Sequence, residues 1–402
     1  MKIAIAGAGI GGLTAALCLH EQGHEVRVFE AADVLEPLGV GINIMPHASG
    51  VLHRLGLGPA LDEMAIRTRA IEYRTRFGHL IQSDPRCVEA GFEYPQYSIH
   101  RGELQFLLLD EVRARAGADA VTTRKVVTGF SQEENGLHVL FSDGGAFKSE
   151  ILIGADGFRS KVRRQLYPDE GPARYEGTMM WRGANLQAPF GDGVTMFIAG
   201  DHNVKIVCYP ISGRAARDGK ALVNWVAEVR HDQPRAADEA DWSCEGDRNF
   251  ISEFLDFRMP DIDIEALLTR TQKITRYPMI DRDPLPRWTQ GRVTLLGDAA
   301  HPMYPIGANG GSQAIIDARA LADALDLHPG PKALLNYERV RRPATTQVVL
   351  ANRKSGPEEV LDIAAARVKG PQDRIEDLIS PEELEEVAAR YRQVAGFVKK
   401  AG

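Results

Sequence analysis

The sequence predicts an α/β fold in which a parallel sheet covered by helices is interleaved with a second, β-rich part. The first 30 residues run as strand, helix and strand, an order that makes a parallel βαβ unit. Between residues 174 and 275 short alternating apolar runs replace this pattern, and a buried strand with a following helix returns at 293–325. A chain of 402 residues has room for both parts.

Each element is inferred from its local pattern. The opening unit has an apolar strand at 2–6, a glycine-rich turn, an amphipathic helix from about 10 to 22 and a strand at 25–30. A hairpin region at 69–100 turns at Phe77-Gly78. Periodicity and apolar runs also predict helices at 46–55 and 102–116, and strands around 120–130, 137–142 and 151–154.

The β-rich part has alternating runs at 194–199, 205–211 and 222–229, which predict an antiparallel sheet with one covered face. A buried strand at 293–296 and a helix at 312–325 then follow. The tail at 381–399 carries apolar residues at helical spacing, which we interpret as a packing or dimer contact, with a lid as the alternative.

Composition narrows the class of protein. The formal net charge of −7 gives no support for nucleic-acid binding. The four cysteines have no C-x-x-C spacing and the histidines and acids show no metal motif, so we expect a cytoplasmic protein without a metal site. No run of 18 apolar residues predicts a membrane span, and the glycine-rich start argues against a signal peptide.

The turn after the first strand reads Gly7-Ala8-Gly9-Ile10-Gly11-Gly12, which matches G-x-G-x-x-G. Gly7 permits the tight turn, Gly9 lets the backbone approach a pyrophosphate, and Gly12 allows close helix–strand packing. Glu30 ends the second strand, where a carboxylate can accept hydrogen bonds from ribose hydroxyls. The pattern predicts dinucleotide binding but does not choose between FAD and NAD, and a purely structural glycine turn is the alternative.

Two further motifs follow buried strands. One runs from Gly154 through Asp156-Gly157 to Arg159-Ser160, and the other is Gly297-Asp298-Ala299-Ala300-His301-Pro302, followed by the segment 305–310. With these three motifs in order over about residues 1–350, the sequence resembles the single-component FAD-dependent aromatic hydroxylases of the para-hydroxybenzoate hydroxylase fold. The resemblance implies a discontinuous, Rossmann-like FAD-binding domain (1–68, 101–173 and 276–350), a β-sheet substrate domain (69–100 and 174–275) and a C-terminal helical tail (351–402).

Within that family the sequence more closely resembles the pyocyanin-forming 5-methylphenazine-1-carboxylate monooxygenase subfamily. The similarity is carried by the segments from Gly39 to Ile44 and from Tyr94 to Leu104, by Met180-Trp181-Arg182-Gly183, and by Tyr277-Pro278-Met279 with the following segment from Asp281 to Pro286. It suggests a subfamily and leaves the substrate open.

The resemblance implies roles for individual residues. Asp298 would contact the ribityl chain of FAD, Arg101 the pyrophosphate, and Arg159 the nicotinamide of a transient NADH or NADPH. A helix N-cap is the alternative for Asp298 and a surface charge the alternative for Arg101. The expected cofactor-binding residues are Gly9, Ile10, Gly11, Gly12, Glu30, Ala31, Gly41, Ile42, Arg101, Val126, Asp156, Arg159, Asp298, Pro305, Gly307, Ala308, Asn309 and Gly310.

The substrate pocket is expected between the flavin and the β-rich domain. Its expected lining is Met180, Trp181, Arg182, Trp225 and Pro305, and the candidate catalytic residues are His47, Tyr209 and Tyr304. Arg182 would suit a substrate carboxylate, with structural pairing as the alternative. A core position is the alternative for the aromatic residues on strands.

The resemblance implies a monooxygenase. NADH or NADPH would reduce FAD, O₂ would add at flavin C4a, and the hydroperoxide would transfer one oxygen atom to a small aromatic or N-heteroaromatic ring, with or without decarboxylation. The expected partners exclude nucleic acid and membrane, and the protein is expected to be a monomer or homodimer. Another FAD-dependent oxidoreductase of this fold and a non-catalytic dinucleotide-binding protein are the alternatives.

Overall fold

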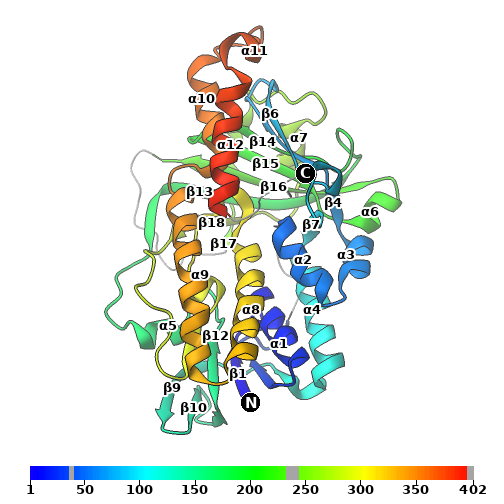
Figure 1. Cartoon of the computed structure of the whole chain (residues 1–402). Helices are drawn as coiled ribbons and strands as arrows, with labels where there is room; N and C mark the ends of the chain where they lie inside the picture. The colour runs from blue at the N-terminus through cyan, green and yellow to red at the C-terminus, as the bar shows by residue number, and fades with distance from the viewer. Residues whose placement is uncertain (36–39, 232–243, 396–402) are drawn as a thin grey trace.

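The computed structural model describes residues 1–35, 40–231 and 244–395. Figure 1 shows two parts stacked along the long axis, with the N-terminus in the lower part and helix α12 crossing the upper part. In the lower part, five of the described strands form a parallel sheet. Across it the order is β19, β12, β1, β2 and β8, which are Val293–Leu295, Ile151–Gly154, Lys2–Ala6, Glu25–Phe29 and Val121–Thr122.

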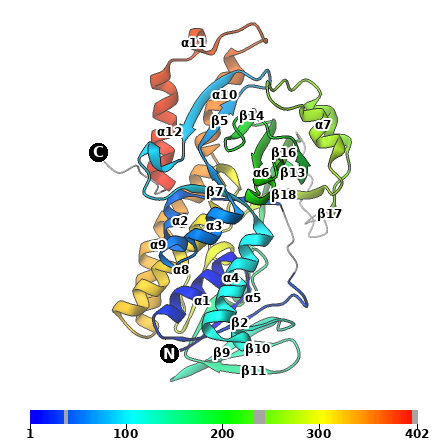
Figure 2. The same cartoon turned by 90° about the vertical axis from the view of Figure 1, so that its right-hand side faces the viewer.

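Helices cover one face of this sheet and a small sheet covers the other (Figures 1 and 2). The helices α4 (Arg101–Ala116), α1 (Ile10–Glu21), α8 (Gly310–Leu327) and α9 (Pro331–Asn352) pack side by side in that order. The opposite face carries the antiparallel strands β9 (Val127–Glu133), β10 (Gly136–Phe141) and β11 (Ala146–Ser149), with α5 (Lys161–Leu166) beside them.

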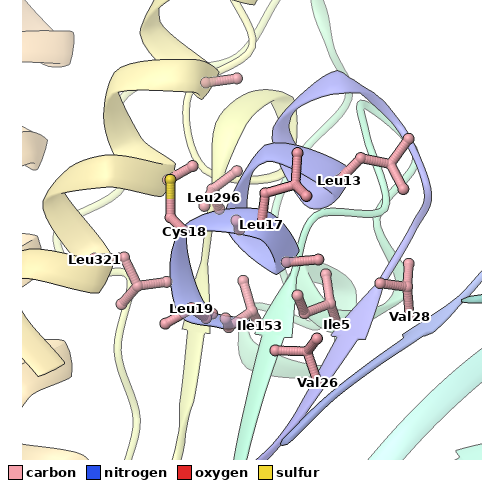
Figure 3. Close-up of a cluster of buried hydrophobic side chains, with 14 of the residues drawn as sticks. Ile5, Leu13, Leu17, Cys18, Leu19, Val26, Val28, Ile153, Leu296 and Leu321 are labelled. Atoms are coloured by element: carbon pink, nitrogen blue, oxygen red, sulfur yellow. The ribbon is translucent and has the colours of Figure 1, made fainter. Parts of the chain in front are cut away.

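The lower core forms because β1 is buried on both faces. Ile5 on β1 and Leu13 on α1 are fully buried. They pack with Ile153 of β12 and Leu321 of α8, as Figure 3 shows. The apolar run at 2–6 therefore becomes the centre of a parallel sheet, where both faces must be apolar.

In the upper part, eight of the described strands form one sheet. In spatial order they are β17 (Cys244–Glu245), β18 (Thr275–Asp281), β13 (Arg174–Gln187), β16 (Ala221–Arg230), β15 (Val204–Pro210), β14 (Met196–Gly200), β5 (Ala70–Arg74) and β6 (Leu80–Pro85). All neighbours are antiparallel except β14 and β5, which are parallel. Strand alternation sends the side chains of β13 and β16 to two different faces.

The two faces of the upper sheet pack against different elements. The outer face packs on the 3₁₀ turn η4 (Asn249–Phe254) and on α7 (Ile264–Arg270). The inner face packs on α10 (Glu359–Arg367) and α12 (Pro381–Ala395), through Leu361, Leu384 and Val387. Between these helices lie the 3₁₀ turn η7 (Gly356–Glu358) and α11 (Ile375–Leu378). The apolar face of α12 is therefore buried within its own chain, and residues 396–399 of the predicted tail lie outside the described residues.

A third sheet joins the two parts. It consists of β3 (Gly41–Ile44), β7 (Gln96–His100) and β4 (Ile66–Thr68), all antiparallel, and α2 (Pro46–Arg54) and α3 (Gly58–Met64) flank it. The remaining short helical segments are η1 (Val88–Ala90), η2 (Ala118–Ala120), α6 (Gly213–Arg217), η5 (Gly297–Ala299) and η6 (Ile306–Ala308).

The α/β class with a β-rich part and C-terminal helices is confirmed, and two details differ from expectation. Strand β7 leaves the hairpin region and pairs with β3 and β4, because its side chains are buried between the two parts. The β14–β5 pair is parallel, whereas the alternating runs predicted an antiparallel sheet. No helix in the described ranges combines the length and apolar character that crossing a bilayer requires.

Candidate active site

The turn between β1 and α1 has the backbone that its glycines predict. Gly7 has φ +100°, in the region that favours glycine. A Cβ on Gly12 would lie 2.1 Å from the carbonyl oxygen of Gly7. A Cβ on Gly11 would lie 2.8 Å from Leu296, at the end of β19. The motif thus packs tightly against its own strand and against the strand end that precedes Asp298.

The N-terminus of α1 is open on the side of Gly9. A Cβ on Gly9 would meet nothing within 4 Å, and this N-cap residue makes no side-chain capping bond. The first N–H groups of a helix have no partner inside the helix, and the helix dipole places partial positive charge there. Ile10, Gly11 and Gly12 therefore begin a site suited to a phosphate.

Glu30 organises the loop after β2. Its carboxylate accepts hydrogen bonds from the N–H groups of Ala8 and Ala32, each at 2.8 Å. The N–H of Lys125 donates to the carbonyl of Glu30 at 2.9 Å, which brings Val126 beside Glu30 and Ala31. The structure thus gathers these three predicted residues next to the glycine turn.

Asp156 and Arg159 lie in the turn after β12. The carboxylate of Asp156 accepts from the Ser160 hydroxyl at 2.5 Å and from the Lys161 N–H at 2.7 Å, at the start of α5. Arg159 is exposed. Asp156 therefore shapes the turn that presents Arg159, and the turn touches the glycine motif at Gly7.

Arg101 is the first residue of α4 and its side chain is exposed. Its N–H donates to the carbonyl of Val40 at 2.9 Å, and His100 pairs with Gly41 across β7 and β3. The strand pairing thus places Arg101 at the side of the segment that carries Gly41 and Ile42.

Asp298 lies in η5, beside the N-terminus of α8, and a buried carboxylate contacts residues on both sides of it. The carboxylate of Asp317, fully buried in α8, accepts from Gly297 N–H at 3.2 Å and from Arg341 Nε at 2.7 Å, and it lies 2.5 Å from His301 Nε2. Burial raises the pKa of Asp317, but His301 and Arg341 outweigh it and lower the pKa to about 2. Residues on both sides of Asp298 are thereby fixed while its own carboxylate stays exposed.

The segment 305–310 forms a tight loop before α8. Gly307 has φ +67°, and Ala308 has φ +53°, an uncommon conformation for a residue with a side chain. The amide of Asn309 donates to the carbonyl of Gly307 at 3.2 Å and to the hydroxyl of Tyr391 at 3.0 Å. Tyr391 of α12, in the C-terminal segment, therefore stabilises this loop.

A cavity extends from this loop to the inner face of the upper sheet and encloses roughly 1140 Å³, its open mouth included. One end is bounded by residues that were predicted to hold a cofactor. These are Gly41, Ile42, Asp298, Pro305, Gly307, Ala308 and Gly310. The other end is mostly apolar, with Met180, Met196, Ile198, Val207 and Val226.

Two polar side chains face each other in the cavity. Arg182 on β13 has no hydrogen-bond partner for Nε among the described residues. Burial raises the pKa of Tyr209 to about 12, although Arg182 beside it acts in the opposite direction. A Cβ on Gly41 would lie 2.6 Å from the Tyr209 ring, so Tyr209 touches the strand at the cofactor end. A neutral phenol and a cation therefore stand where an aromatic acid could bind.

The structure places four predicted residues away from this cavity. Trp181 and Trp225 point to the outer face of the sheet and stack on Phe250. His47 lines a separate hollow between α2, α8 and α9, and Tyr304 lines a second cavity behind the first. Strand alternation explains the tryptophans, since Met180 and Arg182 on the same strand take the cavity face.

Several cavity residues were missed from sequence. Glu228 and Glu358 line the cavity with Tyr73, Arg86 and Tyr391. The available signal was a charged residue inside a mostly apolar strand, as with Glu228 in the run 221–230. Glu358 and Tyr391 come from the C-terminal segment, which no motif marked.

The donors present fit an extended dinucleotide with a ring system at one end. The uncapped N-termini of α1 and α8 suit phosphate and anionic oxygens, and Glu30 and Asp298 suit ribose and ribityl hydroxyls. The missing side chain of Gly41 lets its strand pack directly against Tyr209 at the cofactor end of the cavity. Gly11 packs directly on Leu296, two residues before Asp298, which links the glycine turn to the segment that lines the cavity.

Comparison with known proteins agrees with this arrangement. A family model described as an FAD binding domain matches residues 1–352. The chain is 48% identical over 364 residues to phenazine 1,6-dicarboxylic acid hydroxylase PhzS of Lysobacter antibioticus, covering 87% of this chain and 89% of that protein. It is 33% identical to 3-amino-4-hydroxybenzoate 2-monooxygenase PtmB3 of Streptomyces platensis, covering 97% and 95%.

The fold agrees as well. The crystal structure of Klebsiella pneumoniae HpxO complexed with FAD and uric acid matches with a TM-score of 0.75 and 25% identity, covering 98% of this chain and 93% of that one. With the family model spanning the glycine turn, the Asp298 motif and the cavity loop, this chain belongs to the FAD-dependent aromatic hydroxylases and takes FAD as its cofactor.

Proposed function

We propose that this protein uses NADH or NADPH and O₂ to insert one oxygen atom into an aromatic or N-heteroaromatic acid. The observation that carries the proposal is the single cavity that joins the cofactor loop at Gly307 to Arg182 and Tyr209. Bound FAD supplies the redox chemistry and the activation of O₂. The side chains of this cavity bind the substrate and orient one ring position toward the cofactor end.

Arg182 is the residue proposed to bind a substrate carboxylate. A guanidinium makes paired, charge-assisted hydrogen bonds to a carboxylate, and the Nε of Arg182 has no partner among the described residues. Tyr209, which is neutral at physiological pH, can donate its O–H to the same group or to a ring substituent. Carboxylated aromatic compounds appear in the names of both curated relatives above, a dicarboxylic acid and a benzoate.

The apolar wall suits the rest of such a ring. Met180, Ile198 and Val226 offer flat, water-excluding contacts, and burying an aromatic ring against them is favourable. At the cofactor end, the loop from Pro305 to Gly310 and the N-terminus of α8 can supply N–H groups to negative charge that develops on oxygen. Arg159, exposed beside the glycine motif, is the proposed contact for the transient nicotinamide.

The proposal is tested with purified holoenzyme and a set of aromatic acids. The probes are phenazine-1,6-dicarboxylate, 3-amino-4-hydroxybenzoate and 6-hydroxynicotinate, and each is scored for faster NADH or NADPH oxidation and for product mass. Gain of one oxygen supports hydroxylation, and gain of oxygen with loss of CO₂ supports decarboxylative hydroxylation. A colourless protein that cannot be reconstituted with FAD would contradict the proposal.

A further inference from the structure

Three ionisable side chains meet in the wall between the substrate cavity and the cavity behind it. They are Lys205 of β15, Glu228 of β16 and Glu358 of η7, and they are 5%, 7% and 6% exposed. The ammonium of Lys205 lies 2.9 Å from a carboxylate oxygen of Glu228 and hydrogen-bonds Glu358. Glu228 and Glu358 line both cavities, so the two carboxylates separate one space from the other.

The second cavity leads outward. It encloses roughly 580 Å³, its mouth included, and its rim carries the exposed His202 and Arg230. Tyr304 lines it with a hydroxyl that is buried and has no hydrogen-bond partner among the described residues. A polar chamber with an orphaned hydroxyl and an exposed rim is suited to hold water.

The three groups cannot all be ionised without leaving one net negative charge in the protein interior. Two carboxylates share one ammonium, and burying an unbalanced charge is costly. Burial raises the pKa of Glu358, and Glu228 raises it further, whereas Lys205 and the N–H of Gly307 oppose them. The cluster can therefore take up and release a proton, and Glu358 is the member that also contacts the cofactor loop through Gly307.

Other ionisable groups face the cluster from both sides. In the substrate cavity they are Tyr73, Arg86, Arg182, Tyr209, Asp298 and Tyr391. Arg86 forms a buried ion pair with Asp84 at 2.6 Å, so its charge is balanced locally.

On the side of the second cavity the charged and titratable neighbours include three acids and three bases. They are Glu176, Asp201, His202, Arg230, Arg353 and Asp362. His202 is paired with Asp362 at 2.9 Å, and Arg353 with Asp281 at 2.7 Å. Glu176 pairs with Arg174, Asp201 pairs with Arg76, and Arg230 is exposed to solvent. Among these described residues, the Lys205 cluster is therefore the buried group in which acids outnumber bases.

We propose that Glu358 exchanges a proton with the hydroxyl or ring N–H of the bound substrate and passes it to water in the second cavity. The substrate O–H or N–H bond breaks, its electron pair stays on the substrate atom, and the proton bonds to a carboxylate oxygen of Glu358. The carboxyl then releases the proton to water on its other side, and no electron is transferred. Lys205 and Glu228 are positioning residues. The inference rests on the proposed function, because it requires an aromatic substrate in the first cavity.

The test compares wild-type holoenzyme with Glu358→Gln, which keeps the size and an acceptor oxygen but cannot hold a labile proton. The probes are 3-amino-4-hydroxybenzoate and 3-amino-4-methoxybenzoate, which lacks the phenolic proton. We expect oxygenation of the hydroxy compound to fall about 100-fold, a typical loss for a general base, with much less effect on the methoxy compound. Glu386→Gln, an exposed acid of the same C-terminal segment, is the matched control and should leave both rates unchanged.

Two positioning variants guard against a merely structural effect. Glu228→Gln removes a negative neighbour, so the pH at which oxygenation becomes half-maximal should move down, while Lys205→Met removes the cation and should move it up. Equal rates and an unshifted pH profile in all three variants would overturn the inference. If Glu358→Gln loses FAD, the opposite pH shifts of Glu228→Gln and Lys205→Met decide whether the inference holds.

An infrared titration keeps this inference separate from the proposed function. A protonated-carboxyl stretching band that titrates in wild-type holoenzyme and is missing in Glu358→Gln supports the proton-holding role, and its absence from the wild type overturns it. If the wild type oxygenates no probe, the proposed function fails, and the infrared result alone decides the proton-holding role.

Discussion

The carboxylate of Asp317 lies 2.5 Å from Nε2 of His301 and accepts a hydrogen bond from Arg341 as well. This contact ties α8 to the motif that carries Asp298. We predict that Asp317→Asn lowers the free energy of unfolding by about 3–5 kcal/mol, because it leaves Arg341 buried without its counter-charge. Urea unfolding measures the loss. Asp323→Asn, an exposed acid on the same helix, is the control and should cost less than about 0.5 kcal/mol.

The contacts of Asp317 with His301 and Arg341 also make the stability of the fold depend on pH. Folding lowers the pKa of Asp317 from 3.8 to about 2, so its ionised form stabilises the fold above the unfolded pKa. That contribution falls as the pH drops through 3.8 toward 2. The difference in stability between the wild type and Asp317→Asn should therefore shrink over this range, and a constant difference would contradict the assignment.

A substitution at Gly9 should weaken cofactor binding without affecting folding. A Cβ at this position meets nothing within 4 Å and the backbone is extended, so Gly9→Ala should fold with a stability change within about 0.5 kcal/mol. The added methyl group would instead obstruct the close approach of a pyrophosphate. We expect FAD affinity, measured by fluorescence titration of apoprotein, to fall at least about tenfold. Gly171→Ala, another open position, should change neither quantity.

Asp298 is expected to bind FAD directly. Its carboxylate, in η5, is exposed beside the N-terminus of α8 and lines the cavity, so Asp298→Ala removes a charged acceptor without breaking a buried pair. We expect FAD to bind about 10- to 100-fold more weakly, the range for a hydrogen bond to a charged group. Asp326→Ala, exposed at the other end of α8, is the control. Equal FAD affinity in the two folded variants would remove Asp298 from the site.

Arg182 is expected to set the affinity for aromatic acids. Replacing it with Met keeps an apolar side chain in the cavity and removes the cation. We expect KM for a carboxylated substrate to rise about 10- to 100-fold, and KM for the corresponding amide to change little. Steady-state NAD(P)H oxidation measures both. Arg214→Met, on the exposed side of α6, should have no effect, and parallel changes for acid and amide would refute the carboxylate role.

Trp225 is expected to act on stability alone. Its indole N–H donates to Thr271 at 2.9 Å in the outer core of the sheet, away from the cavity. Trp225→Phe loses this bond and part of the packing, so the unfolding free energy should fall by about 1–3 kcal/mol while KM stays unchanged. An increase in KM without a loss of stability would move Trp225 into the substrate site.

The parts predictable from sequence are those that depend on local geometry. The glycine turn from Gly7 to Gly12 was predictable because Gly7 has a positive φ and because Gly11 and Gly12 pack closely on neighbouring segments. Gly9 differs, since its Cβ position is open. Gly41, Asp298 and the loop at Gly307 also lie together, as the resemblance implied.

The rest depends on which distant segments pack together. Trp181 and Arg182 are adjacent in sequence, and the position of α7 decides which of them faces a core and which a cavity. His47 follows the strand of Gly41 but is turned toward α8 by the helix α2. Glu358 reaches the site from a segment without a motif, because α10 and α12 fold back over the sheet.

The central claim, that the cavity supports insertion of oxygen from O₂, is tested most directly with isotopically labelled gas. Holoenzyme is given NADH or NADPH and an aromatic acid of the set above under ¹⁸O₂, and the product is analysed by mass spectrometry. The account predicts one ¹⁸O atom in the product and faster cofactor oxidation when the acid is present. Oxidation of NADH or NADPH that leaves every acid free of ¹⁸O would contradict it.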